Sequence, residues 1–208
     1  MRSLKLLGAV AALALVSGCA GGALSAPSGF SGFSLVQPRP VQVARGRMVV
    51  TPTMQWNRIP RGQYDVYVEE NWTLNGPVLD GITFLGGIEN NRNIVVQRRQ
   101  ADNKVPAFRS DMTPQDVVDM IESFYMVRGG TIEFNTTGLR PRTFLGHQGF
   151  QFDYTRLGGN ELDRQGRGVA AIIGGRLYLA LFDAARLHYF PAGIGEFERI
   201  IESARLRG

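Results

Sequence analysis

The chain has 208 residues, of which 44% are hydrophobic, 20% are charged and one is cysteine, and its net charge is +5. This composition is typical of a globular protein and excludes a disordered chain or a polytopic membrane protein, and a single cysteine excludes an internal disulfide. The positive charge comes mostly from arginines in scattered pairs, which a GC-rich coding bias would explain. A modest surface for an anionic partner, such as lipid headgroups or another envelope protein, is the alternative. Because nucleic-acid binders usually concentrate their positive charge on one face, no nucleic-acid partner is expected.

The first 19 residues predict export and a lipid anchor. Arg2 and Lys5 form a basic start, and Leu6 to Val16 are an unbroken run of 11 apolar or small residues. This run is far shorter than the ~20 residues that span a bilayer, so it is typical of a secretory signal. The residues that close it, Val-Ser-Gly followed by Cys19, resemble the lipobox of bacterial lipoproteins. The resemblance implies that residues 1–18 are removed and that Cys19 is lipidated and becomes the new N-terminus.

The residues after the cysteine bear on location and on domain organisation. Ala20, rather than an aspartate, follows Cys19, and by resemblance to the sorted lipoproteins of Gram-negative bacteria this favours the outer membrane, facing the periplasm. Residues 19–40 are rich in glycine, proline and serine, a composition typical of a flexible tether. Four apolar residues are unusual in a tether and are expected to pack on the domain, with contact to lipid or a partner as the alternative: Phe30, Phe33, Leu35 and Val36. Residues 41–208 are expected to form a single domain.

From Val41 onward the pattern predicts short antiparallel strands. Val41 to Val50 indicates a first strand, and alternation of apolar and polar residues from Tyr64 to Trp72 indicates another. Asn75-Gly76 is a strong turn signal. Residues 82–85 and 93–97 indicate two further strands, separated by a glycine pair at 86–87 and an asparagine pair.

Two helices are predicted, and the clearer one runs from Thr113 to Arg128. Thr113 is a suitable N-cap, Pro114 suits the first helical position, and Asp116 complements the helix dipole in the first turn. Apolar residues at helical spacing predict that one face packs on a sheet. The second helix is predicted near the C-terminus, where apolar residues recur at helical spacing: Phe197, Ile200, Ile201 and Ala204.

The sequence between the two predicted helices is expected to form the central strands of the sheet. Residues 131–134 and 143–154 are expected to be strands, and residues 158–168 a polar loop. Residues 169–173 and 176–182 predict a hairpin around a glycine pair at 174–175. Because both arms are apolar on both faces, they are expected to be central and covered on each side.

Within residues 143–154 the two parities differ in chemistry. One parity is aromatic and is expected to face a core: Phe144, Phe150, Phe152 and Tyr154. The other parity is polar and is expected to face outward: His147, Gln151, Asp153 and Thr155.

The last third of the chain resembles a known fold family. Gly-Phe-Gln-Phe-Asp-Tyr at residues 149–154, the apolar hairpin at 169–182, and the final helix ending near Ser203 resemble the layout of the PsbP/Mog-like α/β/α sandwich. The resemblance implies an α+β fold in which helices flank a mostly antiparallel β-sheet. It also implies a binding or assembly-support role, because most known members act in that way and not by catalysis. No functional motif of a member maps onto this sequence, so no site residue carries over.

The serine, histidine and carboxylate residues are not at the spacings that a hydrolase site or a metal site requires. A serine hydrolase needs a nucleophile on a strained turn, and the nearest match, around Ser31, lies in the predicted tether and lacks the final glycine. A metal site draws on clustered ligands, whereas His147, which is expected to be exposed, lies far in the sequence from His188, which is expected to be partly buried. Asp153 shares a strand face with His147 but lies about 20 Å along it. We therefore expect no catalytic residue, no metal site and no cofactor.

Taken together, these features favour a non-catalytic envelope lipoprotein that is attached to a membrane through Cys19 and binds a protein or cell-wall component. A small periplasmic hydrolase acting on envelope material is an open alternative, as is a small-ligand carrier, which would need an apolar cavity. A binding surface is expected in the polar loops and on an exposed strand face, around five residues: Trp72, Arg92, His147, Asn160 and Asp163.

Overall fold

The computed structural model describes residues 32–60, 69–96, 104–128 and 130–207, and the residues from 32 onward belong to one compact unit. The predicted signal peptide, Cys19 and much of the predicted tether lie outside the described residues, as does the alternating stretch from Tyr64 to Val68. Neither described helix combines the length and the continuous apolar character that a bilayer crossing requires.

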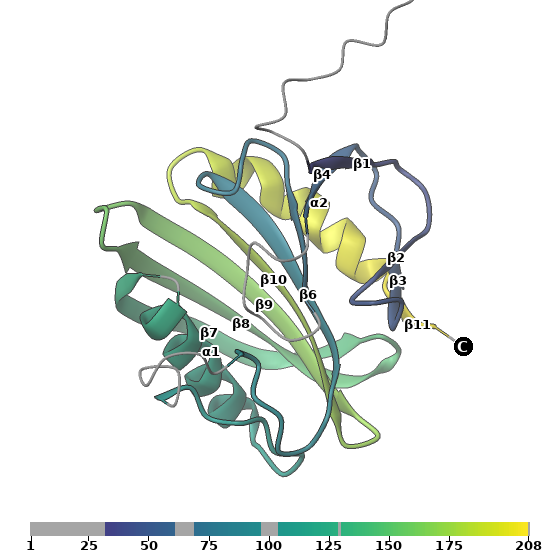
Figure 1. Cartoon of the computed structure of the whole chain (residues 1–208), viewed down its shortest axis with the longest axis vertical. Coiled ribbons are helices and arrows are strands. Elements are labelled where there is room, and N and C mark those ends of the chain that lie inside the picture. The colour runs from purple at the N-terminus through teal and green to yellow at the C-terminus, as the bar shows by residue number, and fades with distance from the viewer. Residues whose placement is uncertain (1–31, 61–68, 97–103, 129, 208) are drawn as a thin grey trace, which may run out of the picture. The chain divides into compact units, whose positions relative to one another are not determined.

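Eight of the described strands form one antiparallel sheet, in the order β1-β4-β5-β6-β10-β9-β8-β7 (Figure 1). Their bounds are β1 Ser34–Val36, β4 Trp56–Ile59, β5 Glu69–Thr73, β6 Asp80–Ile88, β7 Thr131–Phe144, β8 His147–Gly158, β9 Asp163–Ile173 and β10 Arg176–Ala185. β1 falls within the predicted tether, yet it pairs with β4, and Val36 is buried. Phe33 and Leu35 are exposed, so the expectation that they pack on the domain was wrong, and Phe30 lies outside the described residues. The folded unit therefore begins before the predicted boundary at residue 41.

A smaller sheet has the order β11-β3-β2, with β2 at Val41–Val43, β3 at Met48–Val50 and β11 at Arg205–Leu206. The prediction of one strand from Val41 to Val50 was wrong, because the chain turns back between β2 and β3. Arg45 and Gly46 take left-handed backbone conformations in this turn, and the Gly46 N–H donates to the Val43 carbonyl at 3.0 Å. The apolar residues of both strands could not distinguish one strand from a tight hairpin.

The predicted strand at 143–154 was also wrong, because it crosses a hairpin. β7 runs to Phe144, and Leu145 and Gly146, both with positive φ, form the two-residue turn into β8. Phe144 pairs with His147 and so lies on the sheet face opposite that of Phe150 and Phe152. The predicted polar loop at 158–168 is likewise shorter, because β8 continues to Gly158 and β9 begins at Asp163.

Two features next to β6 differ from the prediction. Gly86 and Gly87 lie inside the strand and not in a turn, and the register of β6 against β10 shifts beside them. The Arg47 side chain packs over Gly87, at a position that a larger residue would fill. The predicted strand at 93–97 is absent from its described part, residues 93–96, which lie next to an isolated bridge between Arg92 and Phe108.

The helix α1, Pro114–Arg128, begins where the sequence predicts. The Asp116 N–H donates to the Thr113 hydroxyl at 3.2 Å, and the Thr113 N–H donates to the Asp116 carboxylate at 2.8 Å. This reciprocal pair satisfies two N–H groups that would otherwise lack partners at the helix start. The Asp116 pKa is lowered, chiefly because its carboxylate accepts the Thr113 backbone hydrogen bond.

The two helices pack on opposite faces of the eight-stranded sheet, as alternation along β10 shows. Leu179 and Leu181 share a core with residues of α1. Ala180 and Phe182 share the other core with residues of α2, Tyr189–Glu202. The apolar arms of β9 and β10 are therefore central and covered on both sides, as expected. α2 includes Phe197, Ile200 and Ile201, all three buried as their spacing predicted.

Candidate functional site

Trp72 does not lie on an exposed face, so that expectation was wrong. Its side chain is 0% exposed, and its ring lies 5.0 Å from that of Phe84 and 6.4 Å from that of Trp56. The indole N–H donates to the buried Glu70 carboxylate at 2.9 Å. The alternation of the preceding residues predicted a strand, but it did not reveal that α2 covers this face. Trp72 is a core residue.

The other four residues predicted for a binding surface are exposed but do not converge. Asn160 and Asp163 lie at the turn between β8 and β9. Arg92 and His147 lie at the opposite end of the sheet, because β8 begins at His147 and runs 12 residues to that turn, roughly 35–40 Å. Asp163 forms an exposed ion pair with Arg186 at 3.2 Å. These residues therefore do not form one site.

His188 is exposed, which corrects the expectation that it is partly buried. Its ring contacts Tyr189 edge-on, with the ring centroids 5.0 Å apart. The polar start of α2 thus lies toward solvent, and the buried side of this helix begins with Phe190.

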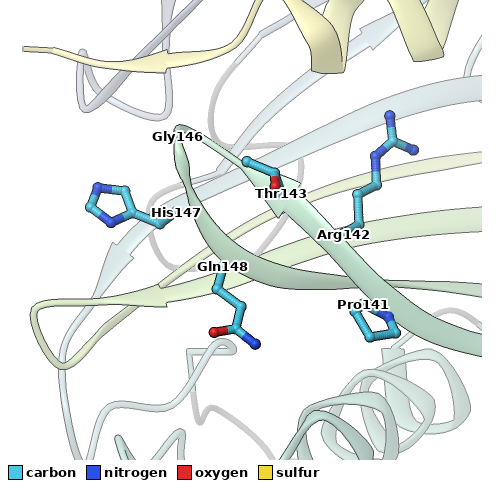
Figure 2. A pocket seen from close by; sticks show the side chains of 6 residues that line it. All are labelled: Pro141, Arg142, Thr143, Gly146, His147 and Gln148. Carbon is cyan, nitrogen blue, oxygen red and sulfur yellow. The ribbon is translucent and has the colours of Figure 1, made fainter.

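The β7–β8 hairpin carries an open hollow of about 300 Å³ (Figure 2). We call it the hairpin hollow, and its lining residues are Pro141, Arg142, Thr143, Gly146, His147 and Gln148. In Figure 2 His147 lies beside the tip at Gly146, and its ring points away from the Arg142 guanidinium. The lining offers a guanidinium, a hydroxyl, an imidazole and an amide. Such groups suit a partner that presents hydrogen-bond acceptors.

One lining residue, Arg142, also belongs to a polar network on the sheet face next to α2. We call this the Arg–carboxylate network, and its members are Arg140, Arg142, Gln151, Asp153, Arg167 and Glu198. Arg142 contacts Glu198 of α2 at 2.6 Å and donates to the Gln151 amide oxygen at 2.6 Å. The network thereby connects the hairpin hollow to the centre of β8 and to α2.

Both carboxylates of this network are held as anions by pairs of arginines. Burial alone would raise the pKa of Asp153, but hydrogen bonds and charges from Arg167 and Arg140 outweigh it and the pKa is lowered. The pKa of Glu198 is lowered in the same way, because Arg142 and Arg167 outweigh the effect of burial. A general acid needs a raised pKa. Neither carboxylate is suited to that role.

A second cluster lies on the other face of the sheet. The Asp183 carboxylate accepts two hydrogen bonds from Arg156, both at 2.8 Å, and others from Arg164 and from the Tyr154 hydroxyl at 3.1 Å. The Tyr125 and Tyr154 hydroxyl oxygens are 2.9 Å apart, so the cluster ties α1 to β8 and β10. The arginine and aspartate side chains of this Asp183 cluster are only 8–11% exposed.

The protonation states of the Asp183 cluster are fixed near neutral pH. Burial alone would raise the pKa of Asp183, but the charges and hydrogen bonds of Arg156 and Arg164 outweigh it and the pKa is lowered. Burial and the nearby Asp183 charge raise the pKa values of Tyr125 and Tyr154. No group in this cluster is poised to exchange a proton at neutral pH, so we assign the cluster to stability.

Sequence reasoning missed the arginines of both clusters. Arg140 and Arg142 alternate along β7, and Gln151 and Asp153 alternate along β8, so a hairpin at 145–146 would have placed the two sets on one face. The alternation was visible in the sequence, but residues 143–154 were predicted as one strand without a turn at 145–146. The described residues hold no group of three or more His, Cys, Asp or Glu side chains arranged to bind a metal ion.

No protein-family model matches this sequence, and no curated protein matches it. Solved structures do match. The solution structure of cyanobacterial PsbP (CyanoP) from Synechocystis sp. PCC 6803 aligns with a TM-score of 0.55 and 13% identity, over 89% of this chain and 100% of that chain. The chain therefore has a PsbP-like fold.

The PsbP-like fold agrees with the expected antiparallel sheet with two helices in a single domain. LpqN, which is involved in cell envelope biogenesis of Mycobacterium tuberculosis, aligns with a TM-score of only 0.36 and 11% identity, over 85% of each chain. That similarity is too low to support an argument. At 13% identity the PsbP-like fold transfers architecture and no functional residue.

Proposed function

We propose that this chain is a non-catalytic envelope lipoprotein, anchored through Cys19 to the outer membrane, whose domain binds a protein or cell-wall component at the hairpin hollow. The domain would be a variant of the PsbP/Mog-like α/β/α sandwich. The lipobox-like residues that end at Cys19 support the location. The observation that carries the binding proposal is Arg142, because it both lines the hollow and is fixed by Glu198 and Gln151.

The way in which Arg142 is held supports binding by a prearranged group. Its side chain is 19% exposed and is oriented by two contacts of 2.6 Å, so little side-chain entropy would be lost when a partner contacts its remaining donors. The arginines also keep Asp153 and Glu198 ionised. The carboxylates of the Arg–carboxylate network thus support the structure of a binding face more than acid–base catalysis.

The edge position of β7 favours side-chain recognition over strand addition. β7 is the last strand of the sheet, but Pro141 lacks an N–H, and the register shifts at two places along its pairing with β8. Proline and bulges are devices that discourage another strand from pairing with an edge. A partner would instead contact the side chains of the hairpin hollow.

The test places a photo-cross-linking residue at His147 in the native lipoprotein and activates it in intact envelopes. The same cross-link placed at Asn160, which is exposed at the opposite end of the sheet, is the control. We expect a reproducible adduct at His147 that is weakened by Arg142→Gln and is unaffected by Arg186→Gln, since Arg186 pairs with Asp163 far from the hollow. Equal adducts at both positions, or none at His147, would contradict the proposal.

A further inference from the structure

A second charged surface lies on the small sheet. Figure 1 shows β2, β3 and β11 together next to the end of α2. Four arginines are exposed on this sheet and its turn, and we call them the arginine corner: Arg45, Arg47, Arg205 and Arg207. The chain brings them together from positions about 160 residues apart, because β11 pairs with β3.

Hydrogen bonds and strand pairing connect Arg207 and Arg205 to the rest of the small sheet. The Arg207 N–H donates to the Arg47 carbonyl at 3.1 Å, and the Arg207 guanidinium donates to Gln42 at 3.2 Å. Arg205 pairs with Val49, and so does Gln42 from the other side. Residues opposite one another in neighbouring strands share a face, so Arg205, Val49 and Gln42 line the same side of the small sheet.

The arginine corner differs from the other charged surfaces because its arginines have no carboxylate partner among the described residues. Some exposed arginines elsewhere do have one, as in the pairs Arg109–Asp111 and Arg176–Glu89. Glu202 is the nearest acidic side chain in the described sequence around β11, and it forms no ion pair with the corner. Guanidinium groups without a carboxylate partner leave a local excess of positive charge that attracts anions.

The positive charge of the arginine corner exceeds the net charge of the whole mature chain. Without residues 1–18, 21 basic side chains remain, the 23 of the chain less Arg2 and Lys5, against 18 acidic ones. The mature net charge is therefore +3, and the four arginines alone carry more than this. The rest of the mature chain is slightly negative. Outside the corner, 17 basic and 18 acidic side chains nearly balance.

We propose that the arginine corner binds the phosphate groups of anionic lipids on a membrane surface. Guanidinium groups match phosphate oxygens in geometry and charge, and clustered basic residues near an anionic bilayer bind it electrostatically. The inference rests on the proposed location at a membrane. From Cys19 to β1 only 14 residues intervene, which span at most about 50 Å, so an anchored domain would stay within reach of headgroups. The corner would orient the domain on the membrane.

The test measures cosedimentation of the full mature chain, residues 19–208, with Cys19→Ser so that no acyl chain contributes. The probes are vesicles of phosphatidylcholine alone and vesicles that also contain phosphatidylglycerol. We expect binding to the phosphatidylglycerol vesicles only, and its loss near 1 M salt, where the Debye length falls to about 3 Å.

Two matched double variants separate the corner from general charge. Arg45→Gln with Arg205→Gln should weaken binding about fivefold for each arginine removed, so about 25-fold in all. Arg109→Gln with Arg176→Gln lowers the net charge equally but should leave binding within about twofold, because both arginines lie outside the corner. Thermal unfolding of each variant checks that the fold is intact.

Three results would overturn the inference: no binding to either vesicle, equal binding to neutral vesicles, or equal losses in the two double variants. Retention on immobilised polyglutamate without vesicle binding would also overturn it, and would assign the corner to an acidic protein. None of these results bears on lipidation of Cys19 or on cross-linking at His147. Failure of this inference is thus distinguishable from failure of the proposed function.

Discussion

The Asp183 cluster allows a quantitative prediction for Asp183→Asn. The substitution preserves the shape of the side chain but removes the negative charge. Arg156 and Arg164, whose side chains are 10% and 8% exposed, would then be buried without a counter-ion. Removing one partner of a buried ion pair typically costs about 3–5 kcal/mol, because the remaining charge is uncompensated.

The remaining contacts place the expected loss near the lower end of that range. Arg164 keeps the carbonyls of Val78 and of residue 183, and Arg156 keeps the Thr131 hydroxyl and the Tyr125 ring, 4.5 Å from its guanidinium carbon. We therefore expect Asp183→Asn to lower the free energy of unfolding by about 3 kcal/mol at neutral pH. That is a large fraction of the roughly 5–15 kcal/mol typical of a domain.

The pH dependence of this loss has a defined sign. The folded-state pKa of Asp183 is lowered, so its stabilising contribution is complete above its unfolded pKa of about 3.9 and is lost as the pH falls through the folded value. Asparagine does not titrate. The difference in unfolding free energy between wild type and Asp183→Asn should therefore be constant near neutral pH and shrink below about pH 4.

The assay is urea unfolding followed by circular dichroism, with Asp163→Asn as the control. Asp163 makes the same kind of ion pair with Arg186, but the two side chains are about half exposed, so the control should change the unfolding free energy by about 1 kcal/mol or less. A loss under about 1 kcal/mol for Asp183→Asn, or equal losses for both variants, would refute the role assigned to the Asp183 cluster.

Three further substitutions test other parts of the fold by the same assay. Thr113→Ala should cost about 1 kcal/mol, because the hydroxyl that accepts the N–H in the first turn of α1 is removed; no change would contradict the assigned cap. Gly168→Ala should cost about 1–3 kcal/mol, since its Cβ would lie 2.2 Å from the Phe152 ring, whereas Gly159→Ala, with its nearest neighbour at 3.4 Å, should be nearly neutral; similar losses would disprove the steric argument. Trp72→Ala should cost about 3–5 kcal/mol, and a small loss would show that Trp72 is not in the core.

Local signals in the sequence predicted what depends on local interactions. The start of α1 followed from Thr113 and Pro114, and the central position of β9 and β10 followed from arms that are apolar on both faces. Glycine pairs were a less reliable signal for turns. The pair at 174–175 is a turn, but the pair at 86–87 lies within β6, because Arg47 from the small sheet packs over it.

The features that the sequence did not reveal depend on contacts between residues that lie far apart in the chain. Trp72 is buried by α2, more than 100 residues later in the chain, so no local pattern distinguished it from an exposed aromatic residue. The Asp183 cluster joins three strands and α1, and its aspartate is the single acidic residue of the mostly apolar strand β10. The arginine corner likewise exists only because β11 pairs with β3.

The proposed anchor that holds the binding domain at a membrane is a lipid on Cys19, and the mass of the native protein tests this anchor most directly. Protein extracted from membranes of the source cells would be measured intact and after proteolysis. We predict a chain that begins at Cys19 and carries covalently bound acyl groups on that residue. Recovery of a chain that begins elsewhere, or of one with an unmodified Cys19 in the soluble fraction, would contradict the claim.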